Sequence, residues 1–203
     1  MKVLVACEFS GIVRDAFKAK GHYAMSCDLL PTEREGLHYK GDVRDIINDG
    51  WDLMIAHPPC TYLSGVGYQW FNEEKYGQKA LDRKEKREDA ILFFTELYNA
   101  NINKICVENP VGYMNSHFKR PTQIIQPYMF GDEARKRTCL WLKNLPMLTP
   151  TNIVGHGDLV VYKGKTHAKW FMDAWHLSPL ERMKERSKTF QGIADAMATQ
   201  WNF

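Results

Sequence analysis

"KVLVACEFSGIVRDAFKAKGH", residues 2–22, decides the fold because two hydrophobic patterns follow each other within it. Residues 2–7 form an apolar run of strand length. After this run, apolar side chains recur at the spacing of one helix face, at Ile12, Val13, Ala16, Phe17 and Ala19. Gly21 marks the end of the helix. The stretch therefore predicts a buried strand, a glycine-containing turn and an amphipathic helix.

The same alternation continues along the chain. Further strand-like runs are "HYAMSCD" (22–28), "WDLMIAH" (51–57), "KICV" (104–107), "QIIQPYMF" (123–130) and "TCLWL" (138–142). Helical spacing returns in "AILFFTELYNAN" (90–101), after a charged run (82–89) expected to be solvated, and in "SKTFQGIADAMATQW" (187–201), expected to pack back on the domain. This order predicts an α/β fold with a mostly parallel sheet and helices on both faces.

Length and composition are those of one ordinary globular domain, which we expect to span residues 1–203. Within it, residues 143–180 are rich in Pro, Gly and His and contain one expected hairpin, "LVVYKGKTHAKW" (159–170). No apolar run reaches the length of a membrane span and the N-terminus lacks the pattern of a signal peptide, so we expect a cytoplasmic protein without membrane contact. The net charge of +3 permits an anionic partner.

The cysteines fall into two groups. There are five, without a CxxC pair, which argues against a disulfide framework and against a zinc site, so we expect no metal. Four lie in or at the end of apolar runs, where cysteine is usually a small buried hydrophobe: Cys7, Cys27, Cys106 and Cys139. Cys60 is the exception, because it follows two prolines in the loop "AHPPCTYLSGVG" (56–67).

Polar residues gather where the predicted strands end. Ligands of open parallel sheets bind beyond the carboxyl ends of the strands, where a crevice and helix N-termini meet. The strands deliver to that edge Glu8, Phe9, Ser10, Gly11, Asp28, Asp42, His57, Pro58, Pro59, Cys60, Glu108, Asn109 and Pro110. Acids and a thiol are therefore concentrated where an α/β site would be.

The first two strand ends favour a nucleoside-type cofactor. An acid at the end of the second strand, here Asp28, is the arrangement that binds ribose hydroxyls. The first turn lacks the GxGxxG pattern that seats a pyrophosphate, so a cofactor without phosphates is favoured, and S-adenosylmethionine is the candidate. Phe9 would pack against it, and Asp42 would either meet the adenine amine or merely cap the turn in "KGDVRD" (40–45).

The order of the short motifs carries a resemblance. The series "FSG" (9–11), "CD" (27–28), "GDVRD" (41–45), "PPC" (58–60), "VENP" (107–110), "FGDEARKRT" (130–138) and "SKTFQGIADAMA" (187–198) resembles the motif series of the DNA cytosine C5-methyltransferases over nearly the whole chain. The resemblance implies a Rossmann-like class I S-adenosylmethionine-dependent fold, with Cys60 as the nucleophile and Glu108 holding the base. The cofactor site that we expect consists of Phe9, Ser10, Gly11, Asp28, Asp42 and Pro58.

The implied chemistry explains these residue types. Cytosine C5 is a poor nucleophile, but a thiolate that adds at C6 makes C5 carbanion-like and able to take a methyl group. Cys60 is therefore expected in a polar, partly open and electropositive site. Glu108 would be protonated or share a proton to hold N3 of the base, which requires a pKa raised by burial.

Departures from the family bear on the substrate. In "DEARKRT" (132–138) the arginine spacing differs, although Arg135, Lys136 and Arg137 remain available, one or two of them to stabilise the base or a phosphate. Only residues 143–180 stand in place of a large target-recognition domain, so the substrate is duplex DNA, single-stranded DNA or a cytosine nucleotide, and a separate protein would supply recognition. Residues 68–79 would form a lid. A basic and aromatic set is either a substrate contact or a solvated hairpin: Lys163, Lys165, His167, Lys169 and Trp170.

Other functions stay open. "HPPC" (57–60) also resembles the motif of amino-methyltransferases, in which an aromatic residue would stand at the position of Cys60. A catalytically inactive nucleic-acid-binding decoy would keep the fold but has no chemical need for Cys60 or Glu108. The compact chain suits a phage or mobile-element protein.

Overall fold

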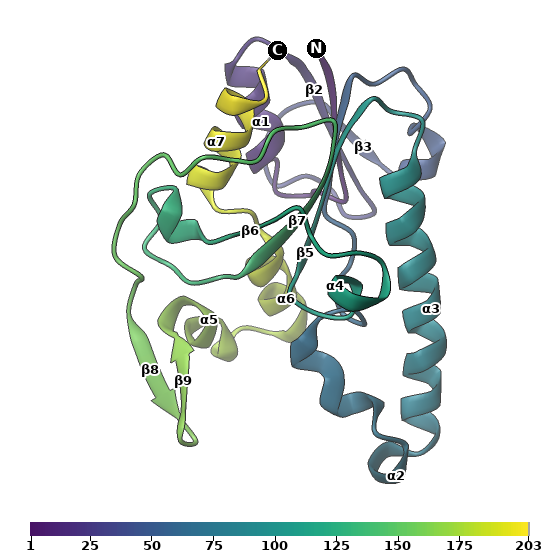
Figure 1. Cartoon of the computed structure of the whole chain (residues 1–203), viewed down its shortest axis with the longest axis vertical. Helices are drawn as coiled ribbons and strands as arrows, with labels where there is room; N and C mark the ends of the chain where they lie inside the picture. Colours follow the sequence, from purple (N-terminus) through teal and green to yellow (C-terminus); the bar gives the residue numbers. More distant parts are fainter. Residues whose placement is uncertain (203) are drawn as a thin grey trace.

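A seven-stranded sheet forms the centre of the molecule (Figure 1). The computed structural model describes residues 1–202, and position 203, the last of the expected domain, lies outside the described residues. The strand order is β3-β2-β1-β4-β5-β7-β6, and β7 pairs antiparallel with both of its neighbours. The strands are β1 (Lys2–Ala6), β2 (Tyr23–Asp28), β3 (His38–Lys40), β4 (Leu53–Ala56), β5 (Lys104–Pro110), β6 (Gln123–Ile125) and β7 (Thr138–Lys143). This largely parallel sheet has the strand arrangement of a Rossmann-like fold, as the sequence predicted.

Helices cover both faces of the sheet, which confirms the predicted layers. Side chains alternate along β1, so that Val3 and Val5 face one core and Leu4 and Ala6 face the other. The first core is closed by α1 (Ile12–Ala19) and α7 (Gln191–Gln200), which pack against each other. The second is closed by α3 (Gln78–Asn99) and α4 (Met114–His117). Both cores consist of buried apolar side chains, most of them aliphatic or aromatic.

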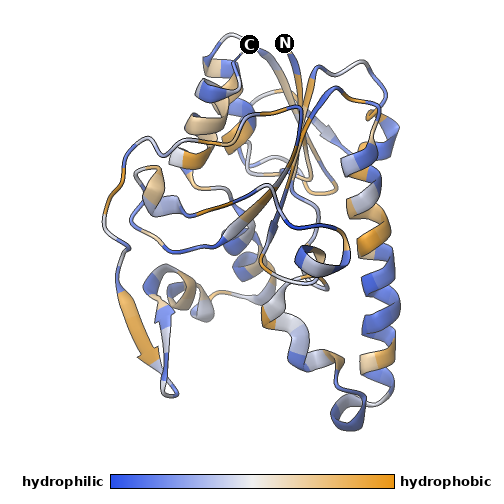
Figure 2. Cartoon of the chain, viewed as in Figure 1, coloured by the Kyte–Doolittle hydropathy of each residue, from blue (hydrophilic) through white to orange (hydrophobic). Residues whose placement is uncertain are grey.

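The remaining elements extend beyond the carboxyl ends of the strands, at the lower end of Figure 1. On one side lie a 3₁₀ helix (Gly65–Phe71) and α2 (Glu73–Tyr76), next to the start of α3. On the other side lie the predicted hairpin, formed by β8 (Leu159–Tyr162) and β9 (Lys165–Ala168), and the helices α5 (Lys169–Asp173) and α6 (Pro179–Ser187). Figure 2 shows β8 as hydrophobic and β9 as hydrophilic.

Several details differ from the sequence prediction: the strand expected at 104–107 continues to Pro110, and α5 and α6 were not expected. Only Gln123–Ile125 of the expected strand 123–130 is extended, because Pro127 opens a 3₁₀ helix, Pro127–Met129, and proline has no N–H for a sheet bond. The short strand β3 was not expected and exists through its pairing with β2. Within residues 1–202, no helix is both long and apolar enough to cross a membrane.

Candidate active site

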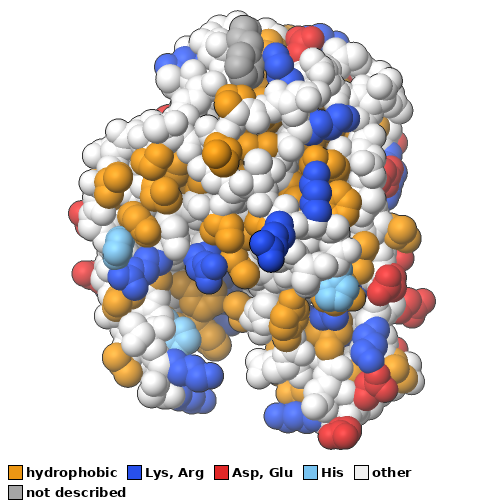
Figure 3. Space-filling model, viewed as in Figure 1, with side chains coloured by type: hydrophobic (Ala, Val, Ile, Leu, Met, Phe, Trp, Pro, Cys, Tyr) orange, Lys and Arg blue, Asp and Glu red, His pale blue; other side chains and the backbone are white. Residues whose placement is uncertain are grey.

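The carboxyl ends of β1, β4 and β5 open into one large cleft of about 1070 Å³. Figure 3 shows the hollow between the hairpin side and the α2 side of the molecule. Seven of the predicted site residues line it: Phe9, Ser10, Pro58, Cys60, Glu108, Arg135 and Arg137. The other three, Gly11, Asp28 and Asp42, lie outside its lining. The cleft adjoins β1 and β4, where the strand order reverses, which is the usual ligand position in such sheets.

The loop that carries Cys60 is fixed at both ends. The His57 N–H donates to the Ala6 carbonyl at 2.9 Å, and the Asn109 side chain, 1% exposed, donates to the Pro58 carbonyl at 2.9 Å. Leu63 and Ser64 both donate their N–H groups to the Cys60 carbonyl, at 3.0 and 2.9 Å. The prolines hold the preceding residues out of the helical region, so the partly exposed Cys60 is presented to the cleft.

Beyond Cys60 the same loop is joined to the residues after β5. The Gly65 N–H donates to the Val111 carbonyl at 3.2 Å, and the Tyr113 N–H donates to the Leu63 carbonyl at 2.7 Å. A Cβ atom at Gly112 would lie 2.1 Å from the Leu63 carbonyl oxygen. Only glycine therefore fits at this crossing of two backbones.

Gly112→Ala is expected to lower the free energy of unfolding by about 1–3 kcal/mol, because the added methyl group must push the two loops apart. Urea titration followed by tryptophan fluorescence measures this change. Gly155→Ala is the matched control, since the nearest atom to its new Cβ would be 3.8 Å away. Equal midpoints for the two variants would contradict the close approach seen at Gly112.

Glu108 is hydrogen-bonded to His57, a residue for which the sequence predicted no role. His57 Nδ1 lies 3.0 Å from Glu108 Oε2, and the two side chains are only 9% and 14% exposed. Burial acts to raise the pKa of Glu108, but the hydrogen bond from His57 and the positive charge of Lys136 outweigh it, so the pKa lies below its ordinary value. The expectation of a raised pKa is therefore wrong, and the direction of the shift favours the carboxylate form of Glu108.

Cys60 also differs from its expected ionisation. Burial raises the pKa of the Cys60 thiol, and the negative charge of Glu108 adds to this effect, while Lys136 opposes it. The expected electropositive site, which would favour a thiolate, is thus only partly present. A pKa raised above the ordinary value of a cysteine makes the thiol the dominant form near neutral pH.

Alkylation should report this raised pKa directly. Because the thiolate is the reactive form, the rate of Cys60 modification by iodoacetamide is expected to rise from about pH 7 to beyond about pH 9 without levelling off. Peptide mass spectrometry assigns the modified cysteine. Lys136→Met should slow the reaction severalfold by removing the opposing positive charge, whereas Lys163→Met, on the exposed hairpin turn, should not. A plateau already below about pH 8 would contradict the raised pKa.

The three basic residues before β7 differ in exposure and in the groups that their charges affect. Arg135 and Arg137 are exposed at the cleft, and the Arg135 side chain lies 2.7 Å from His156 Nδ1. Lys136, between them, is less exposed, and its charge acts on both Cys60 and Glu108. Successive residues of an extended segment point to opposite sides, which separates the lysine from the arginines. Lys136 is therefore the cation closest in effect to the candidate chemistry.

The turn after β1 is closed by its own acid. The Glu8 carboxylate accepts the N–H groups of Val13 at 2.7 Å and Arg14 at 3.2 Å, which caps the N-terminus of α1. Gly11 has a φ of 74°, and a Cβ there would lie 2.5 Å from the buried Arg14 guanidinium. Gly11 is thus required by the packing of the turn, and the helix N-terminus has no free N–H pair for a phosphate.

The two acids expected to hold the cofactor lie at the ends of β2 and β3. Burial raises the pKa of Asp28, although its carboxylate accepts the Leu30 N–H at 2.8 Å. Asp42 caps a 3₁₀ helix, Val43–Asp45, by accepting the Arg44 N–H at 2.9 Å, and it pairs with the Arg44 guanidinium at 3.2 Å. Asp42 therefore caps a turn, which is one of the two roles predicted for it.

Two arginines of the charged run 82–89 contact the Cys60 loop instead of being solvated. Arg83 donates to the Thr61 carbonyl at 3.3 Å, and Arg87 donates to the Tyr62 carbonyl at 3.1 Å. The Arg87 guanidinium lies 3.3 Å from the centre of the Phe71 ring. The segment in which the expected lid (residues 68–79) begins is thus held against α3 by these contacts. The four-residue spacing of these arginines, which places both on one face of the helix, was the sequence signal that could have predicted the shared contacts.

The predicted basic and aromatic set of the hairpin region divides in two. His167 and Trp170 line the cleft, and the indole N–H of Trp170 donates to the Arg135 carbonyl at 3.2 Å. Lys163 and Lys165 are exposed on the hairpin, and Lys169 pairs with Asp173 at 2.6 Å. Only the first pair is placed to touch a ligand in the cleft.

Neither a metal site among the described residues nor a matching protein family is found. Within residues 1–202 no group of three or more His, Cys, Asp or Glu side chains is placed to hold a metal ion, and the five cysteines are free thiols. Cys7, expected to be buried, is partly exposed at the cleft. A scan against protein-family models finds no matching family, and a search of curated proteins finds no match.

Proposed function

We propose that this protein is an S-adenosylmethionine-dependent methyltransferase that acts on C5 of cytosine in DNA through a covalent bond between Cys60 and C6. The observation that carries the proposal is that Cys60 and Glu108, from β4 and β5, line the same cleft as Phe9 and Ser10 of the β1 turn. The sheet order, with β7 as its antiparallel strand, fits the class I methyltransferase fold that the motif resemblance implies.

The residues of the β1 turn fit a cofactor without phosphates. Glu8 already occupies the N–H groups at the start of α1 and brings a negative charge there, so a pyrophosphate has no site. Phe9, Ser10 and Pro58 would hold the cofactor at the cleft, and the acids Asp28 and Asp42 would hold its ribose and adenine. When bound, S-adenosylmethionine supplies an electrophilic methyl group on a positively charged sulfur.

Cys60 and Glu108 divide the activation of the base between them. Addition of the Cys60 sulfur to C6 turns C5 into a carbanion-like centre. Glu108 would hold N3, and the positive charge of Lys136 would stabilise the negative charge that develops in the ring. The raised pKa of Cys60 makes thiolate formation a costly step that substrate binding must favour.

The walls of the cleft fit a nucleic acid strand. Trp70, 45% exposed, comes from the α2 side and Trp170 from the hairpin side, and both line the cleft. Arg83, Arg135 and Arg186 add positive charge to the same lining. Aromatic rings that stack on bases, together with cations that contact phosphates, are the usual means of binding single strands or extruded bases. Because residues 143–180 offer little surface for sequence recognition, a partner protein would supply it on duplex DNA.

Transfer of labelled methyl groups tests this proposal. S-adenosylmethionine carrying labelled methyl is incubated with the protein and duplex DNA, single-stranded DNA or dCMP, and the modified nucleoside is identified after digestion. Label on cytosine C5 supports the proposal and identifies the substrate. Label on an exocyclic amine would instead favour an amino-methyltransferase. No transfer to any of the three, despite cofactor binding measured by calorimetry, would favour either a missing recognition partner or the inactive decoy.

A further inference from the structure

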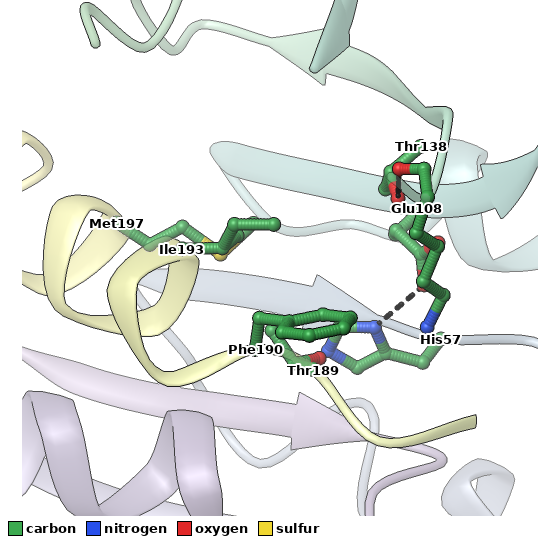
Figure 4. A pocket seen from close by; sticks show the side chains of 8 residues that line it. His57, Glu108, Thr138, Thr189, Phe190, Ile193 and Met197 are labelled. Carbon is green, nitrogen blue, oxygen red and sulfur yellow. Dashed lines mark hydrogen bonds and ion pairs between the residues drawn. The ribbon is translucent and has the colours of Figure 1, made fainter. Parts of the chain in front are cut away.

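His57 and Glu108 both line a small cavity beside the cleft (Figure 4). Its Nδ1 bonds to the carboxylate, whereas its Nε2 is buried without a hydrogen-bond partner. The cavity has about 10 Å³ and is lined by His57, Glu108, Lys136, Thr138, Thr189, Phe190, Ile193 and Met197. That volume admits about one water molecule, and Lys136, Thr138 and Thr189 offer it polar partners. The ring is thus hydrogen-bonded to the candidate acid, and both side chains line a water-sized space.

Charged groups surround this ring. Glu108 from β5 is the anion in contact with it, Lys136 from the segment before β7 is a nearby cation, and Asp28 acts at longer range. Cys60 lies three residues along the same loop. From the side of α7 the cavity receives Thr189 and apolar side chains only. A carboxylate at contact distance therefore faces His57 across a hydrogen bond that can move a proton.

The proposed reaction creates a need for that proton. N3 of the base must be protonated or strongly hydrogen-bonded as Cys60 adds to C6. The lowered pKa of Glu108 favours its carboxylate form, which has no proton to give. Resting on the function proposed above, we propose that His57 supplies the proton that Glu108 passes to N3 of the cytosine.

The transfer balances in atoms and electrons. As the Cys60 sulfur bonds to C6, the C5–C6 π pair moves to C4–C5 and the C4–N3 π pair moves onto N3. N3 takes the proton from the Glu108 carboxyl, and the carboxyl takes the Nδ1 proton of a doubly protonated His57. When C5 later loses its hydrogen to solvent and the sulfur–C6 bond breaks, N3 returns its proton by the same route. His57 is thus a positioning and proton-storing residue that acts through Glu108.

His57→Asn separates proton storage from hydrogen bonding. The asparagine amide can still donate to Glu108 but cannot take up a proton. Methyl transfer by this variant is expected to fall about tenfold at about pH 6 and about a hundredfold at about pH 8, because the carboxyl alone must then hold the proton. His22→Asn, outside the cleft lining, should keep the wild-type profile. A loss by the same factor at every pH would mean a merely structural role and would overturn the inference.

A second measurement does not depend on activity. Nitrogen-15 NMR of the ring-labelled wild-type protein reports which nitrogen of His57 carries a proton. We expect protons on both ring nitrogens, with a hydrogen-bonded Nδ1 proton whose low-field signal disappears in Glu108→Gln. An Nε2-protonated ring with bare Nδ1 would overturn the inference, because His57 would then have no proton facing Glu108. If the wild type transfers no methyl group to any cytosine substrate, the proposed function fails, and the NMR result still decides whether the pair shares a proton.

Discussion

Cys60→Ser is expected to reduce methyl transfer to cytosine by at least about 10⁴-fold, by analogy with the loss on removing other enzyme nucleophiles. A serine hydroxyl is ionised far less than even a thiol of raised pKa, so C6 is not attacked and C5 stays unreactive. Initial rates with labelled cofactor measure the loss. A second readout is a covalent complex with 5-fluorocytosine DNA, stable to denaturing gel electrophoresis, which should form with the wild type and be absent in the variant.

Cys27→Ser is the matched control for this exchange. Cys27 is fully buried outside the cleft lining, and its sulfur lies 3.5 Å from the Gly41 carbonyl oxygen, which can accept a serine hydroxyl. This variant should keep methyl transfer within a fewfold of the wild type. A Cys60→Ser rate within about tenfold of the wild type would mean that the sulfur forms no bond to the base, and label on an amine would then be the result to look for.

Arg14→Met is expected to lower the free energy of unfolding by about 3–5 kcal/mol. The Arg14 side chain is fully buried and binds Asp15 at 2.8 Å. It also donates to Ser26 and Thr32 and to the carbonyls of Arg34 and Glu35, all at 3.1–3.2 Å. Methionine fills most of the volume but leaves these acceptors without their donor. The loop between β2 and β3 would lose its anchor to α1.

Chemical denaturation of the full chain measures this loss, and the chain offers a control at nearly the same place. Arg34→Met removes a guanidinium that is 47% exposed and 3.9 Å from the Asp15 carboxylate. Exposed pairs of this kind contribute less than about 1 kcal/mol. If the two variants unfold at similar urea concentrations, the buried network around Arg14 is not a main source of stability.

The regular part of the fold was predictable because its signals are local. The apolar run of β1 and the helix-spaced stripe of α1 each lie within one short stretch, and both elements are where the pattern put them. β3 has no apolar run of its own, since His38 and Lys40 are polar, and it is a strand only because Ser26 and Asp28 of β2 pair with it. Pairing between distant segments is not visible in a local pattern.

The candidate site was predictable in position but not in ionisation. Cys60 follows β4 and Glu108 lies near the end of the neighbouring strand β5, so their meeting at one sheet edge follows from the topology. Their charge states depend on His57 and Lys136, which come from other parts of the chain and become neighbours only in the folded protein. The contacts of Arg83 and Arg87 with the Cys60 loop were not predicted, because a charged helical run is usually solvated. These contacts too join parts of the chain that become neighbours only in the folded protein.

The acid that caps α1 has a consequence for competition inside a cell. ATP is abundant and shares its adenosine with S-adenosylmethionine, so a site that recognises only adenosine would fill with the wrong molecule. Glu8 sets a carboxylate against the N–H groups that would otherwise attract a triphosphate. Under the proposed function, methyl transfer should persist at ATP concentrations far above those of S-adenosylmethionine, and the selectivity would come from one buried side chain.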